Sequence, residues 1–251
     1  MIKLENVSKK FGTGTFGLSE VSLDVDRGEF VFLVGPTGAG KTTIFRLIIR
    51  EMLPSQGEVL VNDIDIVKLP KNKLAQLRKK IGVVFQDLKL LFDSTVFENI
   101  LLPLDVAGIK RTEATARVNE ILTQVGLLEH KEKFPLQLSG GELQRVAIAR
   151  ALALAPEIIL ADEPTGNLDT DTAWEIVKLL EEINKKGTTV IMATHNDEIV
   201  KNLGKRVVRI EKGKIVKDEK AKNHQSHENQ EKKEEEKKEH EERKEQEEKK
   251  E

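Results

Sequence analysis

Apolar and polar residues follow two different periodicities along this chain. Apolar side chains alternate with polar ones, as in half-buried strands, over residues 2–7, 18–25 and 58–61. Short continuous apolar runs, which predict strands buried on both faces, occupy residues 30–34, 81–85, 158–161 and 188–193. Apolar residues recur at helical spacing over residues 44–49, 112–126, 138–154, 170–186 and 197–203.

The alternation of buried strands with helices predicts an α/β fold with a parallel sheet. The early amphipathic strands predict an added antiparallel sheet, and residues from about 88 to 155 predict a helical insert. Within this insert we expect two short helical pieces around residues 96–102, next to Pro103. Residues 207–210 and 214–216, separated by a short turn, predict a terminal hairpin.

The composition changes sharply near residue 218. Charged residues make up 33% of the 251 residues, but from Lys217 to Glu251 the only apolar side chain is Ala221. We therefore expect one globular domain over residues 1–218 and a charged tail over 219–251 that is solvated or partly helical. An alternative is a lever that binds lipid or another protein, although the slightly acidic balance of the tail argues against anionic lipid.

Charge and apolar content limit the possible partners. The net charge of −2 gives no electrostatic indication of a nucleic-acid partner, and the absence of cysteine excludes disulfides. No signal peptide is apparent, and no apolar run approaches the roughly 18–20 residues that a membrane span needs. We expect a cytoplasmic protein that reaches the membrane only through a partner.

Residues 35–43 lie between a buried apolar run and an amphipathic helix, the order that a phosphate-binding loop requires. Its glycines let backbone N–H groups turn toward phosphate oxygens, and the helix start adds a positive dipole end. Lys41 can reach the β- and γ-phosphates, and the Thr42 hydroxyl can bind Mg²⁺. A plain glycine-rich turn is the alternative. The loop consists of Gly35, Pro36, Thr37, Gly38, Ala39, Gly40, Lys41, Thr42 and Thr43.

Asp162 and Glu163 follow a buried apolar run, where α/β sheets place their ligand sites. The aspartate can hold Mg²⁺, and the glutamate can polarise an attacking water. Alone, such a pair is as often a helix cap. Combined with a phosphate loop about 120 residues upstream, it predicts the metal-and-base half of an ATPase.

Residues 138–145, LSGGELQR, form the most specific motif in the chain. Its Ser-Gly-Gly at a helix start offers a hydroxyl and open backbone N–H groups, which together predict a second anion-binding site. A plain helix cap is the alternative. Because one chain does not need two triphosphate sites, the motif raises the question of whose phosphate it meets.

Taken together, these motifs resemble those of ABC-type ATPases, in the family's order, over residues 1 to about 218. The resemblance implies a P-loop NTPase core with a parallel sheet, an antiparallel β subdomain and an α-helical signature subdomain. It implies ATP and Mg²⁺ as cofactors, with residues 35–43 as the Walker A motif. The signature residues would be Ser139, Gly140, Gly141 and Glu142.

The same resemblance assigns roles to individual residues. It implies Glu163 as the catalytic base, with His195 as the switch histidine and Gln86 as the Q-loop glutamine. Gln86 would approach Mg²⁺ together with Thr42 and Asp162. Asp169 would lie at a subunit interface.

Phe11 occupies the position where an aromatic ring stacks on adenine in this family. Many members have tyrosine there, so the stacking would survive without the hydroxyl. A core phenylalanine is the alternative.

The family also answers the question of the second anion site. Two subunits pack head to tail, so that each signature helix contacts the ATP on the partner's Walker A motif. The resemblance therefore implies a homodimer on ATP binding and a weak ATPase as a monomer.

Within the family, the chain is most similar to the cell-division group, the FtsE type. Residues 83–91, 95–99, 161–169 and 172–190 carry this resemblance. It implies a permease-like membrane partner of the FtsX type, regulation of cell-wall hydrolases, and a location on the inner face of the cell membrane. Two alternatives stay open: an ATPase of a lipoprotein-release or macrolide-efflux complex, and a soluble ABC ATPase that acts on nucleic acid or ribosomes.

Overall fold

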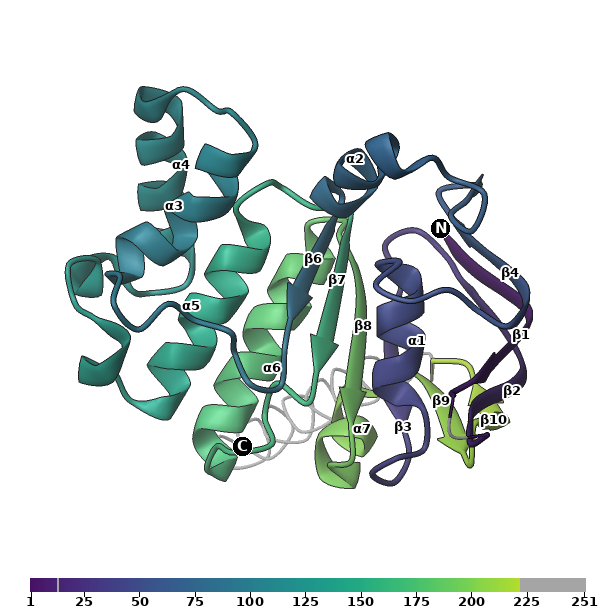
Figure 1. The fold of residues 1–251 in the computed structure, drawn as a ribbon. Coiled ribbons are helices and arrows are strands. Elements are labelled where there is room, and N and C mark those ends of the chain that lie inside the picture. Colours follow the sequence, from purple (N-terminus) through teal and green to yellow (C-terminus); the bar gives the residue numbers. More distant parts are fainter. Residues whose placement is uncertain (13, 222–251) are drawn as a thin grey trace, which may run out of the picture.

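The computed structural model describes residues 1–12 and 14–221 and arranges them around two sheets (Figure 1). The larger sheet has the strand order β10-β9-β3-β8-β7-β6, and the smaller one has the order β2-β1-β4-β5. The larger sheet contains β3 (Phe30–Val34), β6 (Ile81–Val84), β7 (Ile158–Asp162), β8 (Thr189–Thr194), β9 (Arg206–Glu211) and β10 (Lys214–Glu219). The smaller sheet contains β1 (Ile2–Lys10), β2 (Phe16–Val25), β4 (Gln56–Val61) and β5 (Ile64–Asp65).

The pairing confirms the predicted fold class. Strand β3 pairs in parallel with β8 and β9, and β7 pairs in parallel with β8 and β6. The smaller sheet is antiparallel throughout, and β9 and β10 form the expected terminal hairpin. The predicted charged tail begins at residue 219, and from residue 222 onward it lies outside the described residues.

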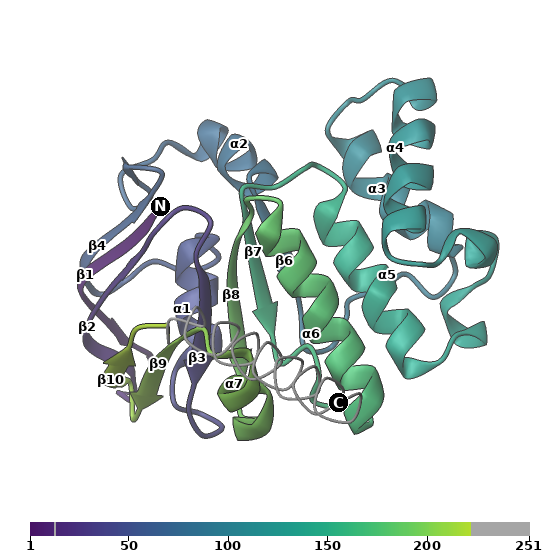
Figure 2. The same ribbon diagram turned by 180° about the vertical axis from the view of Figure 1, so that it is seen from behind.

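Each buried strand of the parallel sheet serves two hydrophobic cores, because successive side chains point to opposite faces. In β3, Phe32 and its neighbours at alternate positions pack in a core shared with helices α3 to α7. Val31 and Leu33 pack in a second core, shared with α1 and the antiparallel sheet. Figure 1 accordingly shows α1 between the two sheets, and Figure 2 shows α6 on the opposite face of the parallel sheet.

Helices account for most of the remaining described chain. The α-helices are α1 (Lys41–Ile48), α2 (Leu74–Lys79), α3 (Val96–Val106), α4 (Arg111–Gln124), α5 (Gly140–Leu152), α6 (Thr170–Lys185) and α7 (Asp197–Leu203). Short 3-10 turns occupy Lys71–Lys73, Leu128–His130 and Pro135–Gln137. Helices α3, α4 and α5 form a unit at one side of the parallel sheet (Figure 1).

The expectation of two short helical pieces around residues 96–102 is wrong, because the structure has one helix, α3, that continues through Pro103. Its start is stabilised by a capping box in which Thr95 and Glu98 bond each other's backbone N–H groups. Ile100 and Leu104 are buried in the core. Capping and burial together outweigh the single backbone hydrogen bond that the proline removes.

Topology sets which ends of the elements meet. The arrowheads of β6, β7 and β8 point to one edge of the sheet (Figure 1). Helix α5 ends a few residues before β7 begins, so α5 runs against the strands and starts near that same edge. The carboxyl ends of the strands and the start of α5 therefore face the same side of the molecule.

Asn99 fixes the loop before α3 through four hydrogen bonds although its side chain is fully buried. The two hydrogens of its amide nitrogen are shared among the carbonyl oxygens of Leu91, Ser94 and Thr95, and its oxygen accepts from the Leu91 N–H. We predict that Asn99→Ala lowers the free energy of unfolding by about 2–4 kcal/mol, because buried backbone groups lose their partners. Urea denaturation measures this, with the exposed Asn202→Ala as the matched control. Equal stability of the two variants would contradict the prediction.

Candidate nucleotide-binding site

The loop between β3 and α1 presents an uncapped helix start. Gly40 precedes α1 with φ of +115°, no side chain caps this end, and its first turn carries no acidic residue. A Cβ at Gly40 would lie 2.8 Å from both Leu18 Cδ2 and the Gly17 carbonyl oxygen, so the close packing also requires glycine. The backbone N–H groups and the positive end of the helix dipole are therefore available to an anion.

A cavity of about 350 Å³ lies over this helix start and brings the predicted residues of the phosphate loop side by side with those of the strand ends. Of the proposed site residues, it is lined by Phe11, Pro36, Thr37, Gly38, Ala39, Gly40, Lys41, Thr42, Thr43, Gln86, Asp162, Glu163 and His195. Gly35 does not line the cavity, but its carbonyl oxygen accepts a hydrogen bond from Lys41 Nζ at 2.6 Å.

Lys41 and Glu163 form a buried charge pair in this cavity. Lys41 is only 7% exposed, and its Nζ lies 3.2 Å from Glu163 Oε1. The other carboxylate oxygen of Glu163 lies 2.8 Å from His195 Nδ1. Glu163 adopts a left-handed backbone conformation, with φ of +50°, which is uncommon for a side chain of this kind. Backbone strain of this type concentrates at functional sites.

Asp162 and Thr42 meet across the cavity, from the end of β7 and the first turn of α1. Thr42 Oγ1 donates to Asp162 Oδ2 at 2.8 Å, whereas the buried Asp162 Oδ1 has no hydrogen-bond partner among the described residues. Burial raises the pKa of Asp162, and the negative charge of Glu163 raises it further. A buried carboxylate oxygen without a partner, next to a hydroxyl, is a donor set that suits Mg²⁺.

Two phenylalanines stand at the outer wall of the cavity. Phe11 is 38% exposed, so the structure does not place it in the core. Its ring packs over Gly17, where a Cβ would lie 2.5 Å from Phe11 Cε2. Phe16 is also exposed and lines the cavity, and Lys10 Nζ lies 5.5 Å from the centre of its ring. Both rings offer apolar faces on which a base could stack.

This cavity is not lined by the signature residues Ser139, Gly140, Gly141 and Glu142, nor by Asp169, which is predicted to lie at a subunit interface. Ser139 caps α5, and Asp169 caps α6 by accepting hydrogen bonds from the Thr172 N–H and hydroxyl. A Cβ on Gly141 would lie 2.4 Å from Thr172 Cγ2, so the starts of α5 and α6 are in close contact. The described chain therefore carries two separate groups of predicted site residues.

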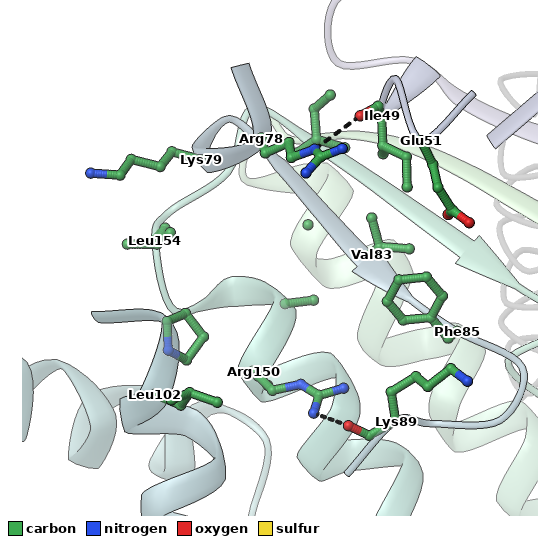
Figure 3. Close-up of a pocket in the computed structure, with 14 residues that line it drawn as sticks. Ile49, Glu51, Arg78, Lys79, Val83, Phe85, Lys89, Leu102, Arg150 and Leu154 are labelled. Atoms are coloured by element: carbon green, nitrogen blue, oxygen red, sulfur yellow. Dashed lines mark hydrogen bonds between the residues drawn. The ribbon is translucent and has the colours of Figure 1, made fainter. Parts of the chain in front are cut away.

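A second hollow, which we call the groove, opens on another side of the parallel sheet (Figure 3). It has a volume of about 520 Å³ and an apolar floor that includes Val83, Phe85 and Leu102. Cationic side chains from α2, α5 and the loop after β6 surround this floor: Arg78, Lys79, Lys89 and Arg150. Arg150 donates to the carbonyl oxygens of Leu88 and Lys89, as Figure 3 shows for Lys89.

A smaller cavity of about 320 Å³ connects the two. It shares Thr42, Gln86 and Asp162 with the nucleotide cavity, and it shares Val83 and Phe85 with the groove. Gln86 thus lies between the two openings.

Sequence reasoning missed several of these residues. Phe16 was not considered, although an aromatic residue after a glycine-rich loop is a detectable signal. The groove joins α2, β6, α3 and α5, which are far apart in the chain, so no local pattern indicates it. His130, which lies 2.9 Å from Glu142 Oε1, was also missed, because only the fold brings the two together.

The family model of the ABC transporter matches residues 18–166, more than half of the chain. The chain belongs to the ABC transporter ATPase family. This ABC ATPase is 48% identical over 228 residues to the cell division ATP-binding protein FtsE of Bacillus subtilis, covering 91% of this chain and 100% of that protein. It is 42% identical over 215 residues to FtsE of Escherichia coli, covering 86% and 97% of the two chains.

Solved ABC structures agree with the fold. The dimeric bacterial ABC transporter cassette MJ0796 matches with a TM-score of 0.82 and 39% identity, over 89% of this chain and 100% of that one. MJ0796 in a dimeric post-hydrolysis state, bound to ADP and phosphate, matches with a TM-score of 0.81 and 38% identity, with the same coverage. The family and these matches confirm the prediction of an ATP-binding and ATP-hydrolysing protein. No helix among the described residues is long and apolar enough to span a bilayer.

We predict opposite effects of Asp162→Asn on stability and on activity. A raised pKa means that folding disfavours the charged carboxylate, a penalty that is absent below the ordinary carboxyl pKa and fully present above the raised one. At pH 7 the variant should therefore melt at a higher temperature without ligand, while Mg²⁺-dependent ATP hydrolysis should fall about 10- to 100-fold. Thermal melts at pH 7 and a phosphate-release assay measure both. A lower melting temperature, or full activity, would contradict the assignment.

Proposed function

We propose that this ABC ATPase works as a homodimer that closes on ATP, with each nucleotide held between the cavity of one copy and the signature residues of the other. The observation that carries this proposal is the presence of two separate halves of a site in one chain. Lys41, Asp162 and Glu163 line the cavity, whereas Ser139 and Gly141 lie outside it at the start of α5. Both halves face the same side of the molecule, so a twofold axis can bring each against the other. The dimeric form of the MJ0796 cassette supports this assembly.

Within the cavity we assign the chemistry as follows. Lys41 and the backbone N–H groups of residues 37–43 bind the phosphates, and Phe11 stacks on the base. Glu163 accepts a proton from the attacking water, and His195 senses the γ-phosphate while holding Glu163 at 2.8 Å. Hydrolysis at this site depends on positioning and charge neutralisation rather than on a covalent intermediate.

Asp162 and Thr42 are the residues that would hold Mg²⁺, with Gln86 close by at the cavity wall. When bound, the ion neutralises the charge on the phosphates. The unpartnered Asp162 Oδ1 supports this assignment.

The biological role that we propose is in cell division. The identity to FtsE proteins supports this role, and it favours a permease-like membrane subunit of the FtsX type as the partner. ATP-driven closing of the dimer would then act on the membrane subunit and so regulate cell-wall hydrolases. The protein would lie on the cytoplasmic face of the membrane, held there by its partner.

The groove supports a protein partner at this position. Its apolar floor, with Val83, Phe85 and Leu102, offers the kind of concave surface on which a helix of another chain packs. Because Gln86 lies in the cavity that joins the groove to the nucleotide site, a partner in the groove would be close to the phosphates. We propose that Gln86 couples the nucleotide state to the membrane subunit.

We predict that Glu163→Gln binds ATP and accumulates as a closed dimer, since turnover falls about 100- to 1000-fold without the general base. Size-exclusion chromatography with light scattering, with and without ATP, measures this. Lys41→Ala is the matched control and should stay monomeric, because it loses the phosphate contacts. A Glu163→Gln protein that stays monomeric with ATP and keeps near-normal turnover would contradict both the assignment of Glu163 as the base and the proposed dimer.

We predict that Leu102→Arg reduces co-purification of the membrane subunit about tenfold or more, because it puts a charge on the apolar floor of the groove. The closed dimer of Glu163→Gln should still form in this background. Val106→Arg is the matched control: it lies on the same helix and is 80% exposed, but it does not line the groove. Equal recovery of the membrane subunit with both variants would rule out the groove as the docking site. Co-purification of nucleic acid or ribosomes in place of a membrane subunit would favour the alternative of a soluble ABC ATPase.

A further inference from the structure

Glu142 places a negative charge beside the group that would meet a phosphate. Its Oε2 accepts hydrogen bonds from the Ser139 N–H and from Ser139 Oγ, each at 2.7 Å. The first turn of α5 carries this acidic residue itself, whereas the first turn of α1 has none and begins with Lys41. Because like charges repel, Glu142 opposes the approach of a triphosphate to Ser139 unless a counter-charge is present.

Lys133 and, in its protonated form, His130 supply that counter-charge from the loop between α4 and α5. His130 Nδ1 lies 2.9 Å from Glu142 Oε1, and Lys133 Nζ lies 3.3 Å from the same ring nitrogen. The side chains of His130 and Glu142 are 27% and 29% exposed, so water screens this pair only in part. A carboxylate oxygen can only accept, so a hydrogen bond to Glu142 needs the proton on Nδ1; Lys133 then acts on Glu142 through its charge and not through a hydrogen bond to the ring.

The loop itself is anchored, so these groups are held in place. The carbonyl oxygens of Lys131 and Lys133 accept hydrogen bonds from the N–H groups of Phe97 and Val96, at the start of α3. The loop thus links the start of α3 to the start of α5.

Ser139 has a single hydroxyl proton, which limits it to one acceptor at a time. In this structure it is donated to Glu142, so Ser139 must withdraw it before it can donate to a phosphate. The pKa of Glu142 is lowered, mainly by the hydrogen bonds from Ser139 and further by the charges of His130 and Lys133. The carboxylate is therefore ionised at neutral pH, and a donor on its second oxygen weakens its hold on the hydroxyl.

We propose that His130, supported by Lys133, is a positioning residue for ATP-driven dimerisation. His130 balances the charge of Glu142, and this frees the Ser139 hydroxyl to donate to the nucleotide bound by a second copy. This inference rests on the proposed composite site. It distinguishes His130 from the groups that touch nucleotide, since His130 acts only through Glu142.

A double-mutant cycle in the Glu163→Gln background tests the inference. The measurement is the ATP concentration that gives half-maximal dimer, by analytical ultracentrifugation. His130→Ala should raise this concentration about two- to fivefold, the range expected of one partly exposed charge pair. When Glu142→Gln is also present, His130→Ala should have no effect, because no carboxylate remains to be balanced.

Two further variants complete the design. His130→Lys, which keeps a donor and a positive charge, should restore dimerisation, and ATP binding to the monomer should stay unchanged in every His130 variant. Lys131→Ala, which removes a neighbouring cation that forms no ion pair with Glu142 among the described residues, should behave as the parent. An equal effect of His130→Ala with and without Glu142, or no effect in either, would overturn the inference. If the Glu163→Gln parent fails to dimerise at all, the proposed function fails first and the inference falls with it.

Discussion

The nucleotide-binding site depends on charges of both signs that are held inside one cavity. Lys41, Asp162 and Glu163 are largely buried, and they come from two points of the chain, the start of α1 and the end of β7, that the parallel sheet brings together at one edge. Without ligand, Lys41 is balanced by Glu163 and the Gly35 carbonyl, and Thr42 partly balances Asp162. Removing one partner from such a set leaves an uncompensated buried charge, so these residues are strongly coupled. A triphosphate with a cation fits this set because it carries both signs itself.

The same topology explains why the site is divided. Helix α5 returns against the strands, so its start lies at the ligand edge but beside α6 rather than over the phosphate loop. The close contact between Gly141 and Thr172 fixes that separation within one copy. A second copy is therefore the simplest source of the missing half for each cavity. The groove adds a third surface, and Gln86 lines the smaller cavity that joins the groove to the nucleotide site.

Much of this arrangement was predictable from the sequence, because it depends on local patterns. The phosphate loop is contiguous, and the Asp162-Glu163 pair lies at the end of a strand. Local strand, loop and helix patterns are therefore enough to locate both in the fold. Alternation of apolar and polar residues predicts the antiparallel sheet, and short continuous apolar runs predict the parallel one. The prediction failed at Pro103, where local propensity was outweighed by capping at Thr95 and by burial of Ile100 and Leu104. It also missed β5, because two residues carry no periodic signal.

The remaining features arise from contacts between distant residues. His130 meets Glu142 only because the loop is anchored on α3, and the orphaned oxygen of Asp162 follows from the depth of its burial. Sequence patterns indicate neither the contact between His130 and Glu142 nor the depth at which Asp162 is buried. Phe16 is an intermediate case, since its position was visible but its exposure was not.

The most direct test of the composite site is complementation between two defective copies in the Glu163→Gln background. One copy carries Lys41→Ala, which removes its own phosphate contacts, and the other carries Ser139→Arg, which blocks the signature residues. Each alone should fail to associate at saturating ATP, but a mixture contains one intact composite site per heterodimer. We expect ATP-dependent capture of one tagged copy by the other only in the mixture. Capture that is absent in the mixture, or equal in all combinations, would contradict a site shared between two copies.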